Sequence, residues 1–215
     1  MKKSFKILLV SSLLFIIGCG SVTNITGYWN EDAYMRQTYK KIGIIAITSY
    51  IQKRDIVESK FAERFILNGY QAIECSKFLT PEIMKRKDKG EITNLLKKNN
   101  IDGFLIVSVL DIKESEHYVP GSSQYYPRTY YNNYYDYYSY QYDRVYTEGY
   151  YEKSVEVFLE SNFYNVNSEK LVSTIQTETA NPADIDDLAD SFSNTVVKAL
   201  VENGVIKKVQ PTNAQ

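Results

Sequence analysis

Residues 41–47 read Lys-Ile-Gly-Ile-Ile-Ala-Ile, a continuous apolar run of strand length. A strand with one wet face alternates apolar and polar residues, whereas an unbroken apolar run is typical of a strand buried on both faces. Strands of that kind occur in parallel sheets that helices cover. The run therefore predicts an α/β fold in which residues 41–47 lie inside the sheet.

The flanking sequence supplies the other elements of such a sheet. Apolar spacing, capping residues and turn signals predict three helices, over residues 54–68, 80–100 and 183–203, the second interrupted at residues 85–90 by charge and a glycine. Further strands are predicted over residues 70–75, 103–112, 154–164 and 170–179. The result is a single mixed sheet on the border between α/β and α+β, in the order β-α-β-α-β-β-β-α. A long Tyr-rich hairpin insertion over residues 115–151 separates the third and fourth strands.

The amino terminus has the pattern of a bacterial export signal. Three lysines precede an apolar run from Ile7 to Ile17, which is shorter than the roughly 20 residues that a membrane-spanning helix needs. Cys19 follows Ile16-Ile17-Gly18, and this arrangement resembles the lipobox of bacterial lipoproteins. The resemblance implies cleavage between Gly18 and Cys19, and attachment of acyl chains such as palmitate to Cys19.

The resemblance to lipoproteins also implies a location. Gly20 stands where an Asp would favour retention at the inner membrane, so we expect an outer-membrane lipoprotein that faces the periplasm. The chain then divides into a signal peptide (1–18), a flexible tether (19–39), an α/β domain (40–205, with the insertion at 115–151) and a loose tail (206–215).

Charge argues against one class of partner, and cysteine content bears on the chemistry of the domain. The 215 residues include 25 basic and 26 acidic side chains, and removal of residues 1–18 moves the formal charge from −1 to −4. This balance argues against a nucleic-acid partner. Lipidation of Cys19 would leave Cys75 without a disulfide partner, and Cys75 is expected to be a small packed thiol.

Tyrosines are concentrated in the insertion, where fourteen of the twenty lie between Tyr118 and Tyr151. Three interpretations stay open: a variable loop, an aromatic surface that binds sugar rings or an apolar protein patch, and a segment for self-association. The candidate binding surface consists of Tyr125, Tyr126, Tyr130, Tyr131, Tyr134, Tyr135, Tyr137 and Tyr138.

Catalytic motifs are not recognisable in the sequence. The single histidine, His117, lies near Glu114 and Glu116, but this group is too small and too local for a strong metal site. Phosphate-binding glycine loops and a nucleophile elbow are also missing from the sequence. We therefore predict no catalytic, metal or cofactor residue.

Two stretches carry a resemblance to a group of envelope proteins. After the lipobox, residues 41–47 lead into a helix that ends Asn-Gly-Tyr, and residues 95–107 run Leu-Leu-Lys-Lys-Asn-Asn-Ile-Asp-Gly-Phe-Leu-Ile-Val from helix into strand. This arrangement resembles the α/β lipoprotein domains of the curli-secretion and penicillin-binding-protein-activator type and the TolB amino-terminal domain. The resemblance implies an α/β fold and an envelope-assembly setting, but it assigns no functional residue.

The expected function is therefore non-enzymatic binding or assembly in the envelope. The expected contacts are the membrane, through acyl chains on Cys19, and an envelope protein or the cell-wall glycan. The alternatives are a self-assembling secretion or structural lipoprotein and, less favoured, a glycan-active enzyme that uses carboxylates.

Overall fold

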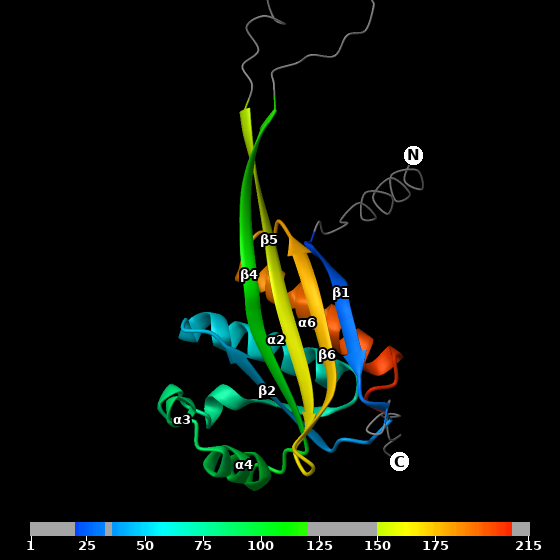
Figure 1. Cartoon of the computed structure of the whole chain (residues 1–215). Helices are drawn as coiled ribbons and strands as arrows, with labels where there is room; N and C mark the ends of the chain where they lie inside the picture. The colour runs from blue at the N-terminus through cyan, green and yellow to red at the C-terminus, as the bar shows by residue number, and fades with distance from the viewer. Residues whose placement is uncertain (1–19, 33–35, 120–149, 208–215) are drawn as a thin grey trace, which may run out of the picture.

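The computed structural model describes residues 20–32, 36–119 and 150–207, which form one open six-stranded sheet with helices on both faces (Figure 1). The strand order is β1-β6-β5-β4-β2-β3. The strands are β1 (Val22–Asn30), β2 (Lys41–Ile47), β3 (Gln71–Glu74), β4 (Gly103–Val119), β5 (Tyr150–Asn165) and β6 (Lys170–Ala180). The helices are α2 (Ile51–Leu67), η3 (Cys75–Lys77), α3 (Pro81–Arg86), α4 (Lys89–Lys98) and α6 (Ile185–Glu202).

Strand β2 has the buried position that its sequence predicts. It pairs in parallel with both β3 and β4, and residues 42–46 are all buried. Ile44 packs into the cluster beneath the long helices, whereas Ile45 packs into the cluster on the opposite face. The mixed α/β sheet predicted from the sequence is confirmed.

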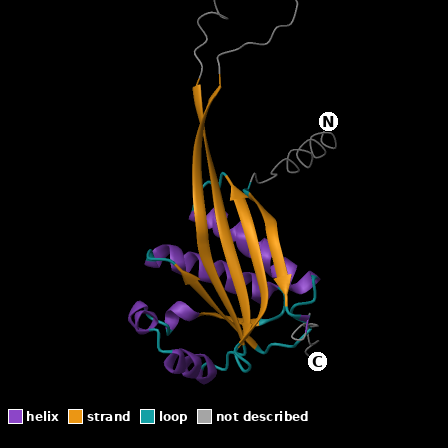
Figure 2. Ribbon diagram, in the orientation of Figure 1, coloured by secondary structure: helices purple, strands orange, loops and turns teal. Residues whose placement is uncertain are grey.

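Helices α2 and α6 cover one face of the sheet (Figure 2). Their apolar sides meet where the rings of Phe61 and Phe192 pack edge to face at 5.1 Å. Both rings are buried, together with Leu105, Phe163 and Ile175 from three neighbouring strands. Burial of such a side chain contributes about 1.5–3 kcal/mol, so this layer is the main core.

Helices α3 and α4 cover only one end of the opposite face. Lys87 ends α3 in the left-handed region with φ 54°, and Asp88 begins α4 by accepting a hydrogen bond from the Glu91 amide at 3.0 Å. The interruption predicted at residues 85–90 within the helical region 80–100 is therefore a sharp bend between two helices. Leu96 from α4 and Phe104 from β4 belong to the small core beneath them.

The flexible tether predicted for residues 19–39 is wrong over residues 22–30. These residues form β1, which pairs antiparallel with β6 at the edge of the sheet. Thr23 hydrogen-bonds Thr179 across this pair at 2.7 Å, and both hydroxyls are buried beside α6. The predicted order therefore lacked its first strand.

The boundaries of the insertion and the tail also differ from the prediction. Strand β4 continues to Val119 and β5 begins at Tyr150, and the two stay paired along this whole extension. Ile206 is fully buried and bridges to Gln37, so residue 206 is part of the domain rather than of a loose tail. The signal peptide, Cys19 and residues 208–215 lie outside the described residues.

Candidate functional site

The carboxyl end of β2 is the place where open α/β sheets commonly bind ligands, and here an ion pair fills it. Arg54 and Glu58 of α2 are 6% and 0% exposed, and Arg54 Nε donates to Glu58 Oε1 at 2.8 Å. The same carboxylate accepts the amides of Ala46 at 3.1 Å and Ser76 at 2.7 Å, and Arg54 Nη2 donates to the Leu79 carbonyl at 2.8 Å. Because these hydrogen bonds engage both side chains, the pair holds α2 against the strand ends. It presents no accessible polar group that could bind a ligand.

Cys75 is not placed for nucleophilic chemistry. The thiol is fully buried, and burial, followed by the negative charge of Glu58, raises its pKa far above the ordinary value. A thiol in this setting stays protonated at neutral pH, and the thiolate is the reactive form. The prediction that Cys75 is a small packed thiol is confirmed.

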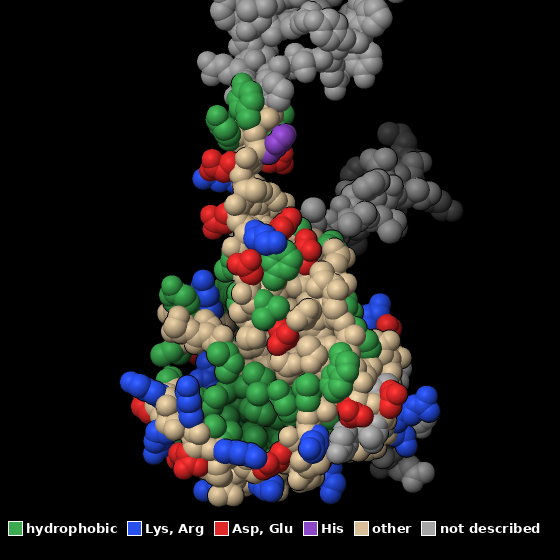
Figure 3. Space-filling model, viewed as in Figure 1, with side chains coloured by type: hydrophobic (Ala, Val, Ile, Leu, Met, Phe, Trp, Pro, Cys, Tyr) green, Lys and Arg blue, Asp and Glu red, His purple; other side chains and the backbone are tan. Residues whose placement is uncertain are grey.

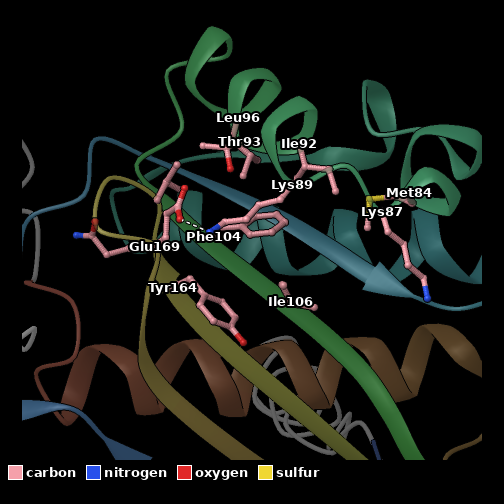
Figure 4. Close-up of a pocket in the computed structure, with 12 residues that line it drawn as sticks. Met84, Lys87, Lys89, Ile92, Thr93, Leu96, Phe104, Ile106, Tyr164 and Glu169 are labelled. Atoms are coloured by element: carbon pink, nitrogen blue, oxygen red, sulfur yellow. Dashed lines mark ion pairs between the residues drawn. The ribbon is translucent and has the colours of Figure 1, made fainter.

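A concave apolar pocket of about 480 Å³ lies between α3, α4 and the lower ends of β4 and β5. Figure 3 shows it as an apolar hollow on the face that α2 and α6 leave uncovered. In Figure 4, Ile92 and Leu96 project from α4 toward Phe104 and Ile106 on β4. The apolar lining consists of Met84, Ile92, Leu96, Phe104, Ile106, Tyr164 and Val166.

The pocket exists because the two helices cover the sheet incompletely. Phe104 and Tyr164 are directly paired neighbours on β4 and β5, so their rings point to the same face. The bend at Lys87 turns α4 back over Phe104, but none of the described helices lies over the next positions along the strands. Ile106 is therefore only partly buried.

Charged side chains form the rim of the pocket. Lys89 at the start of α4 reaches Glu169 in the β5–β6 turn with Nζ to Oε2 at 2.6 Å, which closes one side of the mouth (Figure 4). This lysine lowers the pKa of the Glu169 carboxyl, first through the hydrogen bond and then through its charge. Between residues 85 and 98 the sequence has six basic and two acidic side chains, so the helix pair around the pocket carries an excess of positive charge.

The side chains singled out from the sequence lie far from this pocket or outside the described residues. Glu114, Glu116 and His117 are exposed on the extension of β4, with His117 opposite Glu152. Across residues 20–32, 36–119 and 150–207, no three potential metal ligands come together. The candidate surface from Tyr125 to Tyr138 lies outside the described residues and stays a prediction.

The amino-terminal end of the described chain is fixed to α6. The Ser21 amide donates to Asp187 Oδ1 at 3.0 Å, and Asp187 Oδ2 accepts the Ala183 amide at 2.9 Å. These bonds place residue 21 beside the first turn of α6, at the end of the sheet opposite the pocket (Figure 1). Among the described helices, none combines the length and the apolar character that a membrane crossing requires.

Sequence reasoning missed the pocket because its lining comes from five separate segments. The available signal was local: Ile92, Leu95 and Leu96 give α4 one apolar side, and Phe104 and Ile106 give one face of β4 an apolar stripe. These patterns do not predict that α4 covers only part of β4.

Comparison with known proteins shows no family for this chain. No family model matches the chain, and no curated protein matches it. The PelC dodecamer structure from Paraburkholderia phytofirmans aligns over 84% of this chain and 96% of that chain, with 10% identity and a TM-score of 0.45. Lipoprotein GNA1162 from Neisseria meningitidis aligns over 74% and 96%, with 11% identity and a TM-score of 0.38. At these values the likeness assigns neither a family nor a function to the chain.

Proposed function

We propose that the protein is a lipid-anchored, non-enzymatic binding protein of the bacterial envelope, located at the outer membrane and facing the periplasm. Its pocket between α4 and the β4–β5 pair would receive an apolar side chain from an acidic segment of an envelope protein. The single observation that carries this proposal is the apolar hollow of about 480 Å³ with a basic surround.

The lining of the pocket favours an apolar anchor over a sugar. Known small-ligand sites run from about 300 to 1,000 Å³, so the hollow is large enough for one or two bulky side chains. Its walls are aliphatic and aromatic, and the uncharged polar groups of the lining are Thr93, Asn165 and the Tyr164 hydroxyl. A glycan site would need many more hydrogen-bonding groups, whereas a protein anchor in an apolar pocket with a polar rim is a common binding centre.

The charge around the pocket selects the sequence next to that anchor. Six basic side chains between residues 85 and 98 lie in a domain whose formal charge without residues 1–18 is −4. A concentrated positive region attracts acidic partners and repels basic ones, which sets specificity more than affinity. Lys87 and Lys89 both line the pocket, so an acidic residue beside the anchor would meet them directly.

The position of the pocket agrees with a membrane anchor at the other end of the domain. Phe104 lies at the start of β4, and Val22, which follows Ser21, lies at the level reached nine residues later along that strand. A chain attached to the membrane through Cys19 would therefore present the pocket toward the periplasm. The absence of a reactive nucleophile at Cys75 and the closed ion pair at Glu58 support a binding role rather than catalysis.

The test uses a photo-crosslinking amino acid in cells. p-Benzoylphenylalanine replaces Thr93, which lines the pocket, and in a matched control it replaces Asn94, which is exposed on the other side of α4. We expect an adduct from position 93 only, with the crosslinked peptide containing an apolar residue flanked by Asp or Glu. Addition of Ile92→Glu should abolish the adduct. A carboxylate in the hollow would exclude the partner's apolar side chain and repel the acidic residues beside it.

Two results would contradict the proposal. One is equal crosslinking from positions 93 and 94, which would mean that the helix surface and not the hollow makes the contact. The other is an adduct that survives Ile92→Glu or that maps to a basic, glycan-bearing or non-protein partner.

A further inference from the structure

The described part of the β4–β5 pair extends well past the start of β1, the strand that follows the proposed lipidation site. Strand pairing sets Val22 level with Ala180, Ala180 level with Glu156, and Glu156 level with Lys113. Among the described residues, only β4 and β5 continue beyond that level, as a two-stranded ribbon that can be followed to the Val119–Tyr150 pair (Figure 1). Six further residues of strand rise about 20 Å.

The amino-terminal segment is too short and too well held to reach as far. The Ser21 amide donates to Asp187 Oδ1 at 3.0 Å, and the Ser21 hydroxyl is 3.4 Å from the Asp187 carbonyl oxygen that it faces. Cys19 is three residues before Val22, so its Cα can rise at most about 10 Å above the start of β1. Because the ribbon rises about 20 Å, the Val119–Tyr150 pair lies at least about 10 Å beyond the furthest level that chain geometry allows for residue 19.

A cysteine that carries a diacylglyceryl group sits at the boundary between headgroups and acyl chains. We infer that the end of the ribbon, formed by Tyr118, Val119, Tyr150 and Tyr151, enters the headgroup layer of the same zwitterionic phospholipid membrane. The inference rests on the proposed lipidation of Cys19, because that bond fixes the height of the membrane relative to the sheet.

The side chains at the ribbon end suit this position. Tyr118, Tyr150 and Tyr151 are 49%, 61% and 68% exposed, and the rings of Tyr118 and Tyr151 lie 5.2 Å apart. Tyrosine is enriched at membrane interfaces, where its ring contacts acyl chains and its hydroxyl stays hydrated.

The charges lie just behind the aromatic end. Glu116 and Lys153 face one another across the ribbon at 3.1 Å, and Glu152 and Glu114 complete a mostly acidic band. This band would lie on the aqueous side of the headgroups. Because it has no excess of Lys or Arg, the ribbon has no electrostatic preference for anionic lipid, and the interaction depends on the aromatic rings.

The experiment places an environment-sensitive fluorophore, NBD, on the full lipidated protein purified from membranes and reconstituted into phosphatidylcholine vesicles. The label is attached through Tyr150→Cys, and the matched control is Ser168→Cys in the β5–β6 turn at the opposite end. Cys75 is buried and does not compete for the label. We expect a blue shift of the label at position 150 and loss of its emission when the vesicles contain headgroup-quencher lipid. The label at position 168 should keep the emission of a fluorophore in water.

Flotation of the same vesicles separates this inference from the proposed lipidation. If the parent protein does not float with the vesicles, or if Cys19→Ala floats as well as the parent, the lipid anchor itself is refuted. If the parent floats through Cys19 but position 150 stays unquenched, the anchor stands and the ribbon inference fails. The inference would also be overturned if the label at position 150 were shielded from water in native membranes but not quenched in pure lipid vesicles. The ribbon would then contact a membrane protein and not the lipid.

Discussion

Substitution of Glu58 by Gln should destabilise the domain far more than its conservative chemistry suggests. Glu58 is fully buried and accepts three hydrogen bonds, from Arg54 Nε, the Ala46 amide and the Ser76 amide, at 2.8, 3.1 and 2.7 Å. Glu58→Gln removes the negative charge and leaves the Arg54 guanidinium buried without a counter-charge. Removal of one partner of a buried ion pair costs about 3–5 kcal/mol.

The chain supplies a matched control at the same helical spacing. Lys198 and Glu202 on α6 are also four residues apart, but their side chains are both 64% exposed and 4.0 Å apart. Glu202→Gln should therefore change the free energy of unfolding by less than about 0.5 kcal/mol. Urea unfolding of a chain that begins at Gly20, followed by circular dichroism, gives both values.

A double substitution tests whether the uncompensated charge is the cause. Arg54→Met combined with Glu58→Gln removes the buried cation, so we expect the double variant to be more stable than Glu58→Gln alone. A loss below about 1 kcal/mol for Glu58→Gln would refute the reasoning, because it would mean that water or a shift of the backbone replaces the carboxylate. A double variant no more stable than the single variant would show that the amide hydrogen bonds, not the charge, dominate.

Three further predictions concern packing, reactivity and pH. Gly43→Ala should cost about 1–3 kcal/mol in urea unfolding, because an added Cβ would lie 2.9 Å from Cys75 Sγ; an unchanged midpoint would mean that this contact relaxes freely. Cys75 should not react with Ellman's reagent at pH 8 in the native state and should react fully in urea, since burial raises its pKa; rapid native reaction would show that the site opens. The amides of Ala183 and Ser21 lower the pKa of Asp187, so the Asp187 side chain stays ionised at pH values at which an ordinary Asp is protonated. Its hydrogen bond to the Ser21 amide is therefore fully present above the ordinary Asp pKa and is lost only as the pH falls through the lowered pKa. The Ser21 amide NMR signal should titrate at that lowered value, and Asp187→Asn should abolish the titration; a midpoint at or above the ordinary Asp value would contradict it.

The parts of the fold that the sequence predicts are those where one residue pattern suffices. The unbroken apolar run at residues 41–47 predicts a strand buried on both faces, and the structure confirms it. The alternation of Val155, Val157 and Leu159 likewise predicts β5 with one face toward the core. In both cases side chains alone determine the burial, so no knowledge of the partner strands is needed.

The parts that were missed depend on tertiary neighbours. In β1, only Thr23 is buried, while Val22, Ile25 and Trp29 are exposed, so the segment has no apolar periodicity that would mark it as a strand. Its β-branched and aromatic residues favour a strand, but the pairing with β6 decides it. The pocket also depends on tertiary packing. In the sequence Phe104 and Ile92 look like ordinary core residues, and only the folded arrangement leaves a space between them.

If the chain is exported as proposed, the docking of residue 21 onto α6 has a consequence for the order of events. The hydrogen bond from Ser21 to Asp187 joins residues 166 positions apart, so the first strand finds its place only after nearly the whole chain has crossed the membrane. Until then residues 21–30 lack their partners, and under the proposed lipidation a membrane enzyme would have access to Cys19. Once β6 and α6 arrive, the same segment becomes rigid. Under the proposed lipidation, cleavage and acylation therefore precede the closing of the sheet, and a chain that folds first becomes a poor substrate for both steps.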